Sequence, residues 1–203
     1  MVYDDVVYGP VVIEEPVLLA LLETAALQRL DGVLQHGISA LVGVTSPITR
    51  LEHSLGTMIL VRRLGAALEE QIAALLHDVS HAAFSHVIDY VVDGHNSQSY
   101  HDEVKEAYVA KTDISAVLAQ FGYDWRDFLD ETHYPLLEQP SHRLCADRLD
   151  YFLRDSLPLG LATTEEIAFA LGSLVVVNGR IAANNLEAAQ WLGYTFIACD
   201  DAS

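Results

Sequence analysis

The sequence contains few positively charged residues. Lysines and arginines together number 11 against 29 aspartates and glutamates, which gives a net charge of −18. Only Lys105 and Lys111 are lysines. Because proteins bind nucleic-acid backbones by neutralising phosphates with lysine and arginine, this balance argues against nucleic acid as a partner. A bound phosphate group would have to be held locally, by a few arginines and a cation.

The sequence also lacks long hydrophobic runs and closely spaced cysteines. Apolar residues make up 51% of the chain, but in short runs, far below the roughly 20 residues that cross a bilayer, so we expect no membrane partner. Asp4 and Asp5 stand where a secretory signal carries lysine or arginine. Cys145 and Cys199 lie far apart and predict two buried free thiols. We therefore expect a cytoplasmic protein.

The spacing of apolar residues predicts a mainly helical chain. A length of 203 residues suits one domain with one core, over residues 1–203. Helices are expected over residues 16–30, 50–68, 69–85, 100–111, 113–122, 124–131, 141–157 and 185–199.

Four segments predict other structure. The first 15 residues are rich in valine and should be extended, with a turn at Gly9 and Pro10. Glycines, serines and a proline predict a loop over residues 37–49, and residues 92–99 are polar enough for a surface loop. Two β-branched runs around Asn178 and Gly179 predict a hairpin near the C-terminus.

The stretch LLHDVSHAAFSH, Leu75 to His86, places titratable groups in an apolar helical pattern. A single buried histidine is most often a hydrogen-bonded core residue. Here His77 and His81 are four residues apart, on one helical face, and Asp78 is adjacent. Burying them together costs several kcal/mol unless each finds a partner, and a divalent cation serves all of them. His53 and Asp147, on other apolar helices, complete a set of two imidazoles and two carboxylates.

Four ordered segments carry a resemblance: QRLDGVLQHG, RLEHSLG, LLHDVSHAAFSHVID and ADRLDYFLRDS. They resemble HD-domain metal-dependent phosphohydrolases, in particular the dNTP triphosphohydrolase branch, over about residues 8–160. The resemblance implies an all-α HD-domain helical bundle with a metal-binding core at about residues 27–160, beside the short N-terminal extended segment and the small C-terminal β-hairpin. Triphosphohydrolases of this branch are much longer, so the overall size is most similar to small single-domain HD phosphohydrolases of nucleoside-antibiotic pathways such as oxetanocin.

The resemblance also implies roles for individual residues. His53, His77, Asp78 and Asp147 match the metal ligands, which would hold magnesium, manganese, cobalt or iron. The resemblance also allows a second ion when substrate binds. Residues matching the phosphate site and proton transfer are His81, His86, Asp89 and, with a looser match, His101. Residues matching substrate contacts are Arg50 and Arg148 for phosphate, and Gln35, Tyr151 and Asp155 for the sugar.

The expected function is hydrolysis of a phosphate ester or anhydride in a (deoxy)nucleotide or nucleoside analogue. A water on the metal would lose a proton near neutral pH and attack phosphorus as hydroxide, and His86 or His101 could protonate the leaving oxygen. Three alternatives stay open: release of triphosphate from dNTPs, hydrolysis of cyclic nucleotides or alarmones, and a nucleotide-binding sensor without turnover. The sequence leaves the base and the oligomeric state open, a homo-oligomer included.

The remaining histidines and the two tryptophans have no expected function. The remaining histidines, His36, His95, His133 and His142, are expected at the surface or at helix ends. Trp125 and Trp191 are expected to anchor the core or an interface.

Overall fold

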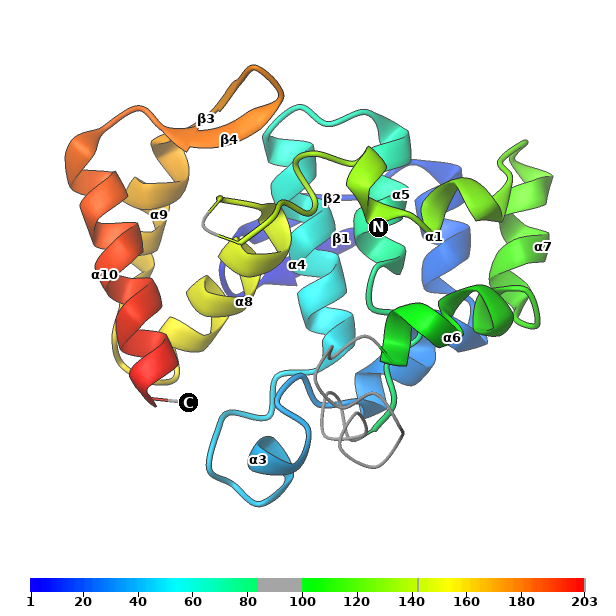
Figure 1. Cartoon of the computed structure of the whole chain (residues 1–203), viewed down its shortest axis with the longest axis horizontal. Helices are drawn as coiled ribbons and strands as arrows, with labels where there is room; N and C mark the ends of the chain where they lie inside the picture. Colours follow the sequence, from blue (N-terminus) through cyan, green and yellow to red (C-terminus); the bar gives the residue numbers. More distant parts are fainter. Residues whose placement is uncertain (84–99, 142, 203) are drawn as a thin grey trace.

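The computed structural model describes residues 1–83, 100–141 and 143–202, with only the backbone over residues 100–103. The described chain is mainly helical, as expected, with two small antiparallel strand pairs (Figure 1). The longer helices are α1 (Pro16–Leu22), α4 (Arg50–Arg63), α5 (Leu68–Leu76), α6 (Tyr100–Val109), α7 (Asp113–Gln120), α8 (Ala146–Ser156), α9 (Thr164–Gly172) and α10 (Leu186–Ala202). Short helical turns are α2 (Ala25–Gln28), η1 (Arg29–Gly32), α3 (Ile38–Leu41), η3 (Trp125–Phe128) and η4 (Glu131–His133).

The N-terminal residues form a hairpin of β1 (Val2–Asp5) and β2 (Gly9–Val12), in which Val2 pairs with Val12. The extended structure is confirmed, but the turn predicted at Gly9 and Pro10 lies before them. Asp5 determines this, because its Oδ1 accepts the backbone N–H groups of Val7 at 2.8 Å and Tyr8 at 3.1 Å. Gly9 opens the second strand with a positive φ of 69°, a conformation that glycine adopts without strain.

Helix α4 runs through the middle of the molecule and carries the candidate ligand His53. It begins with a capping box in which Thr49 and Glu52 satisfy each other's backbone N–H groups. Side chains around most of its circumference are buried, as expected for a helix enclosed by its neighbours. The largest fully buried core side chains are Ile13, Leu18, Leu21, Leu27, Leu30, Met58, Ile59, Leu60, Ile72, Leu75, Ile114 and Leu118.

Several predicted helices have different limits. The helix expected over residues 16–30 is interrupted at Glu23 and Thr24, and Thr24 then caps α2. The helix expected over residues 124–131 is a pair of 3₁₀ turns. The predicted loop over residues 37–49 contains the one-turn helix α3, and α9 was not anticipated.

Two helices next to the candidate ligands are shorter than predicted. Helix α5 ends at Leu76, so the histidine-rich stretch leaves the helix just as it begins. Helix α8 begins at Ala146 rather than near residue 141. At this start, the backbone N–H of Ala146 donates to the carbonyl of Leu136 at 2.8 Å. Tertiary contacts therefore fix both limits.

The C-terminal part packs on α8 (Figure 1). Strands β3 (Leu174–Val177) and β4 (Arg180–Ala183) form the predicted hairpin. Asn178 and Gly179 have positive φ values of 51° and 71°, as a type I′ turn requires.

Among the described residues, no helix combines the length and apolar character needed to cross a bilayer.

Candidate metal centre

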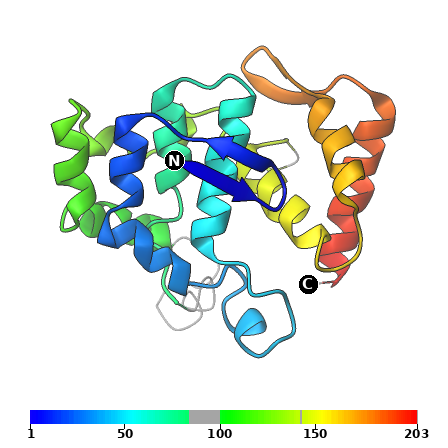
Figure 2. The same ribbon diagram turned by 180° about the vertical axis from the view of Figure 1, so that it is seen from behind.

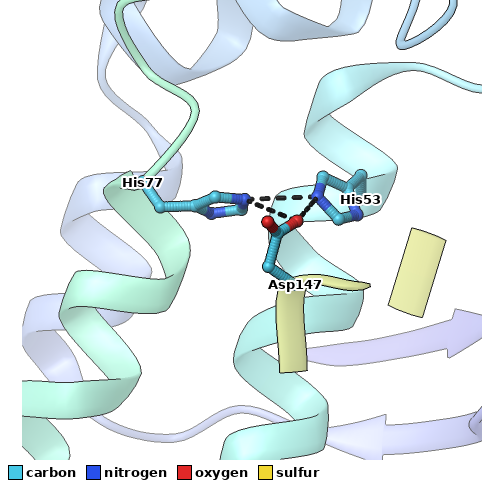
Figure 3. Close-up of side chains that lie close together, drawn as sticks. All are labelled: His53, His77 and Asp147. Carbon is cyan, nitrogen blue, oxygen red and sulfur yellow. Dashed lines mark hydrogen bonds and ion pairs between the residues drawn. The ribbon is translucent and has the colours of Figure 1, made fainter. Parts of the chain in front are cut away.

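Three side chains from three elements converge beside α4 (Figure 3). His53 lies on α4, His77 directly follows α5, and Asp147 lies in the first turn of α8. Each contributes a ligand atom, and these atoms all lie within 4.8 Å of one another. The two Nε2 atoms are 3.2 Å apart, and Asp147 Oδ1 is 2.9 Å from that of His53 and 3.7 Å from that of His77. This spacing suits atoms that share one ion.

The hydrogen bonds of the two rings decide which nitrogen faces the cluster. His77 Nδ1 lies 2.7 Å from the carbonyl oxygen of Ala74, and a carbonyl can only accept, so Nδ1 carries a hydrogen. His53 Nδ1 lies 2.8 Å from Asp150 Oδ2 and donates in the same way. In the neutral form of each ring, Nε2 then presents a lone pair toward Asp147. Two lone pairs and a carboxylate that meet in this way fit a divalent cation.

The electrostatics of the cluster point the same way. Burial alone would lower the pKa of His53, but the carboxylates of Asp147 and Asp150 raise it to about 10. Burial would favour protonated Asp147, but hydrogen bonds from His53 and His77 hold its pKa well below the usual range. Without an ion, protons on the two Nε2 atoms therefore pair with Asp147, and a divalent cation would take the place of these protons. A third of the Asp147 side chain is exposed, so this is a side from which solvent can reach the cluster.

Asp78 lies beside the cluster but outside the group of three. Its oxygens are 3.7 Å from His77 Nε2 and 4.0 Å from His53 Nε2. Arg50 Nη1 binds Asp78 Oδ2 at 2.5 Å, and His81 Nε2 lies 3.2 Å from Oδ1. Burial would raise the pKa of Asp78, but Arg50, His77 and His81 hold it well below its usual value. The expected fourth ligand is thus engaged by Arg50 and His81.

The expected proton-transfer residues are only partly described. His81 contacts Asp78, although not from the helical face predicted for it, because residues 77–80 form turns after α5. His86 and Asp89 lie outside the described residues. His101 falls in the first turn of α6, and its side chain lies outside the described part.

The expected substrate residues lie on both sides of the cluster. Gln35 precedes α4, and its carbonyl accepts a hydrogen bond from Arg50 Nη2 at 3.4 Å. Arg148 binds Glu138 at 3.1 Å and also the carbonyl of Gln139. Asp147, Tyr151 and Asp155 are spaced by four residues along α8 and so share one face, which extends about 12 Å from the cluster.

Two residues of this region were missed from the sequence. His36 was expected at the surface or at a helix end, but its Nε2 lies 2.9 Å from both carboxylate oxygens of Asp155. Asp150, the partner of His53, was not assigned a role. Its position three residues after Asp147 placed it near the site, but only the fold shows that it faces α4.

Comparison with known proteins gives a consistent assignment. The HD domain family matches residues 50–155, which include the three clustered residues. The metal-dependent phosphohydrolase cns2 of Cordyceps militaris is 47% identical over 170 residues, covering 84% of this chain and 49% of that protein. The uncharacterized protein YdhJ of Bacillus subtilis is 43% identical over 192 residues, covering 94% of this chain and 58% of that protein. This chain thus spans about half the length of these relatives.

A solved structure agrees at the level of the fold. A hypothetical protein from Aquifex aeolicus superposes with a TM-score of 0.71 at 25% identity, covering 98% of this chain and 58% of that chain. Its similarity extends over nearly all of this chain, beyond the part matched by the family. On the motifs, the clustered side chains and these comparisons, the chain belongs to the HD domain family.

Proposed function

We propose that this chain is a metal-dependent phosphohydrolase that removes phosphate from (deoxy)nucleotides or nucleoside-analogue phosphates. The observation that carries the proposal is the meeting of two imidazole Nε2 atoms, both with Nδ1 fixed as a donor, and the Asp147 carboxylate. The relative cns2 is a metal-dependent phosphohydrolase by name, which supports the same class of reaction.

In this proposal His53, His77 and Asp147 hold a divalent ion, and Asp78 completes the set by exchanging its contact with Arg50 for the ion. A divalent ion held there supplies Lewis-acid activation of water and of a phosphoryl oxygen. The imidazole ligands suit iron, and the carboxylate ligands suit magnesium and manganese; we also include cobalt among the candidates. Arg50, once it no longer binds Asp78, would stabilise charge on the phosphoryl oxygens.

The substrate would extend along the face of α8 that Asp147, Tyr151 and Asp155 share. Arg148 lies next to Asp147 in the sequence and would contact phosphate. Tyr151 and Asp155 follow on the same face, at a distance comparable to that between a phosphate and the sugar of a nucleotide. His36 contacts Asp155, and the carbonyl of Gln35 accepts a hydrogen bond from Arg50. The sugar hydroxyls would therefore bind between α8 and the segment before α4. We assign proton transfer to His81, His86, Asp89 and His101.

The direct test is hydrolysis by the purified chain. The protein is incubated with dATP, dGTP, dADP and dAMP, each with Mn²⁺, Mg²⁺, Co²⁺ or Fe²⁺, and products are identified as phosphate, pyrophosphate or triphosphate. Release of phosphate is expected, whereas triphosphate would identify a dNTP triphosphohydrolase. Bound metal with no hydrolysis of any nucleotide would overturn the enzymatic proposal in favour of a sensor.

Ligand variants test the metal site itself. His77→Gln and Asp147→Asn each remove one of the three clustered ligand atoms, and we expect metal affinity to fall more than about 100-fold. Mutating a residue that only hydrogen-bonds a metal ligand already lowers affinity about 10- to 100-fold. His133→Gln is the matched control, because its side chain is 70% exposed. Metal content by mass spectrometry and helical content by circular dichroism are the measurements. Retention of the ion by both variants would contradict the assignment.

A further inference from the structure

We propose that Asp5, Arg154 and Asp150 form a buried relay that positions His53 toward the metal ion, which makes the N-terminal hairpin part of the metal centre. The inference rests on the proposed metal-dependent function. It goes beyond that function because none of the three residues is an expected ligand or substrate contact.

The relay begins at the ring of His53. Asp150 has a side chain with no exposed surface, and its Oδ2 accepts the Nδ1 hydrogen of His53 at 2.8 Å. This bond fixes the ring orientation and keeps the hydrogen on Nδ1, so that Nε2 remains directed at His77 and Asp147. A carboxylate that holds the far nitrogen of a histidine also makes the near nitrogen a better ligand. Asp150 is therefore a positioning residue.

Asp150 is held in turn by Arg154. The guanidinium Nε lies 3.1 Å from Asp150 Oδ2, and Nη2 lies 2.9 Å from Oδ1. Both oxygens are thus bound by one planar fork, which restricts rotation of the carboxylate. Burial would raise the pKa of Asp150, but Arg154 and His53 keep it below the ordinary value, so the carboxylate stays charged.

The backbone of α4 leaves room for this pair at one glycine. A Cβ on Gly56 would lie 2.0 Å from Arg154 Nη2 and 2.0 Å from Asp150 Oδ1. Gly56 is three residues after His53 and so lies on the same face of α4. The relay is therefore pressed against the helix that carries the ligand.

The hairpin supplies the last charge. Asp5 is buried, and its Oδ2 lies 3.0 Å from Arg154 Nη2. Its other oxygen accepts the N–H groups of the hairpin turn, so the same side chain fixes the turn and Arg154. Figure 2 shows the hairpin crossing the back of α4 toward α8. Removing one partner from such a buried set leaves an uncompensated charge, so each residue depends on the others.

Metal binding without substrate tests the relay. Mn²⁺ is titrated calorimetrically into the wild-type chain and into Asp150→Asn, Asp5→Asn and Asp4→Asn. We expect Asp150→Asn to weaken Mn²⁺ binding about 10- to 100-fold and Asp5→Asn to weaken it several-fold. Asp4→Asn removes the same charge from the exposed neighbouring residue and should leave affinity unchanged. Asp5→Asn carries the test if Asp150→Asn does not fold.

A second measurement separates the relay from the proposed function. In the metal-free protein, the Nδ1 proton of His53 should give a low-field NMR signal that moves upfield in Asp150→Asn and Asp5→Asn but not in Asp4→Asn. A wild-type chain that binds no ion would overturn the metal centre, while this signal would still report whether the relay holds His53. Unchanged Mn²⁺ affinity and an unmoved signal in Asp150→Asn would overturn the relay. If Asp5→Asn and Asp4→Asn have the same Mn²⁺ affinity and the same NMR signal, the hairpin is not part of the relay.

Discussion

Each histidine of the cluster donates its Nδ1 hydrogen to a fixed acceptor, and this decides where its lone pair points. For His77 the acceptor is the backbone carbonyl of Ala74, one turn earlier, which is left without a partner in the helix where α5 ends. For His53 the acceptor is Asp150, 97 residues away in the sequence. The first could be inferred from local structure, whereas the second depends on how α8 packs against α4.

Gly56 gives a prediction about packing at the scale of one residue. Alanine in a helix interior normally stabilises by about 0.5–1 kcal/mol relative to glycine. At Gly56 the added Cβ would collide with Asp150 and Arg154, so we expect Gly56→Ala to destabilise the protein by about 1–3 kcal/mol, as overpacking does. Chemical denaturation measures this change. Gly193→Ala in α10 is the control, because a Cβ there has no atom within 4 Å, and it should be neutral or stabilising.

The two cysteines give a prediction about reactivity. Both are free and buried, as expected from their number and spacing. Burial raises the pKa of Cys145 to about 12 and that of Cys199 to about 11. Since the thiolate is the reactive form, iodoacetamide at pH 8 should modify both thiols only after denaturation, as counted by mass spectrometry. Rapid labelling of the native protein would contradict the burial of the two thiols and their raised pKa values.

At the scale of elements, the end of α5 shows what periodicity cannot predict. Residues 75–86 follow a helical pattern, yet the helix stops at Leu76 and His77 bonds to the carbonyl of Ala74. Side chains that bind terminal carbonyls are one way in which helices end. His81 still reaches Asp78, because a turn brings its N–H to the carbonyl of Asp78 at 3.0 Å. The right residues thus meet through a different local structure.

The interruption between α1 and α2 gives a testable cap. Thr24 Oγ1 donates to the carbonyl of Leu21 at 2.6 Å and accepts from Leu27 N. Loss of such a cap costs about 0.5–2 kcal/mol, so Thr24→Ala should lower the free energy of unfolding by about that amount. Thr24→Ser keeps the hydroxyl and serves as the control in the same urea titration. Equal stability of the two variants would show that the break depends on other contacts.

One such contact comes from another helix. Asp113, at the start of α7, accepts the backbone N–H of Ala25 at 2.6 Å. An acceptor 88 residues away cannot be read from the pattern of residues 16–30. The apolar spacing predicted helix there correctly, but the position of the break was decided by tertiary contact.

At the scale of the whole molecule, an ion would join α4, the end of α5 and α8. A ligand that binds only the folded state stabilises it by mass action, by about 2.7 kcal/mol at 100 times its Kd. For a chain of this size that corresponds to a rise in Tm of roughly 5–10 °C. Mn²⁺ should therefore raise the melting temperature of the wild type, and a chelator should reverse the shift. Asp147→Asn should show neither effect.

The sequence by itself determined the fold class, the C-terminal hairpin, the free thiols and the family, because these depend on composition, local periodicity and short motifs. It also indicated His53, His77 and Asp147, whose titratable groups stand out in apolar patterns. The tertiary structure alone decided that Arg50 binds Asp78, that His36 binds Asp155, and that Asp5, Arg154 and Asp150 reach His53. These pairings join residues far apart in the chain, and a buried charge is stable only beside the partner that folding brings to it.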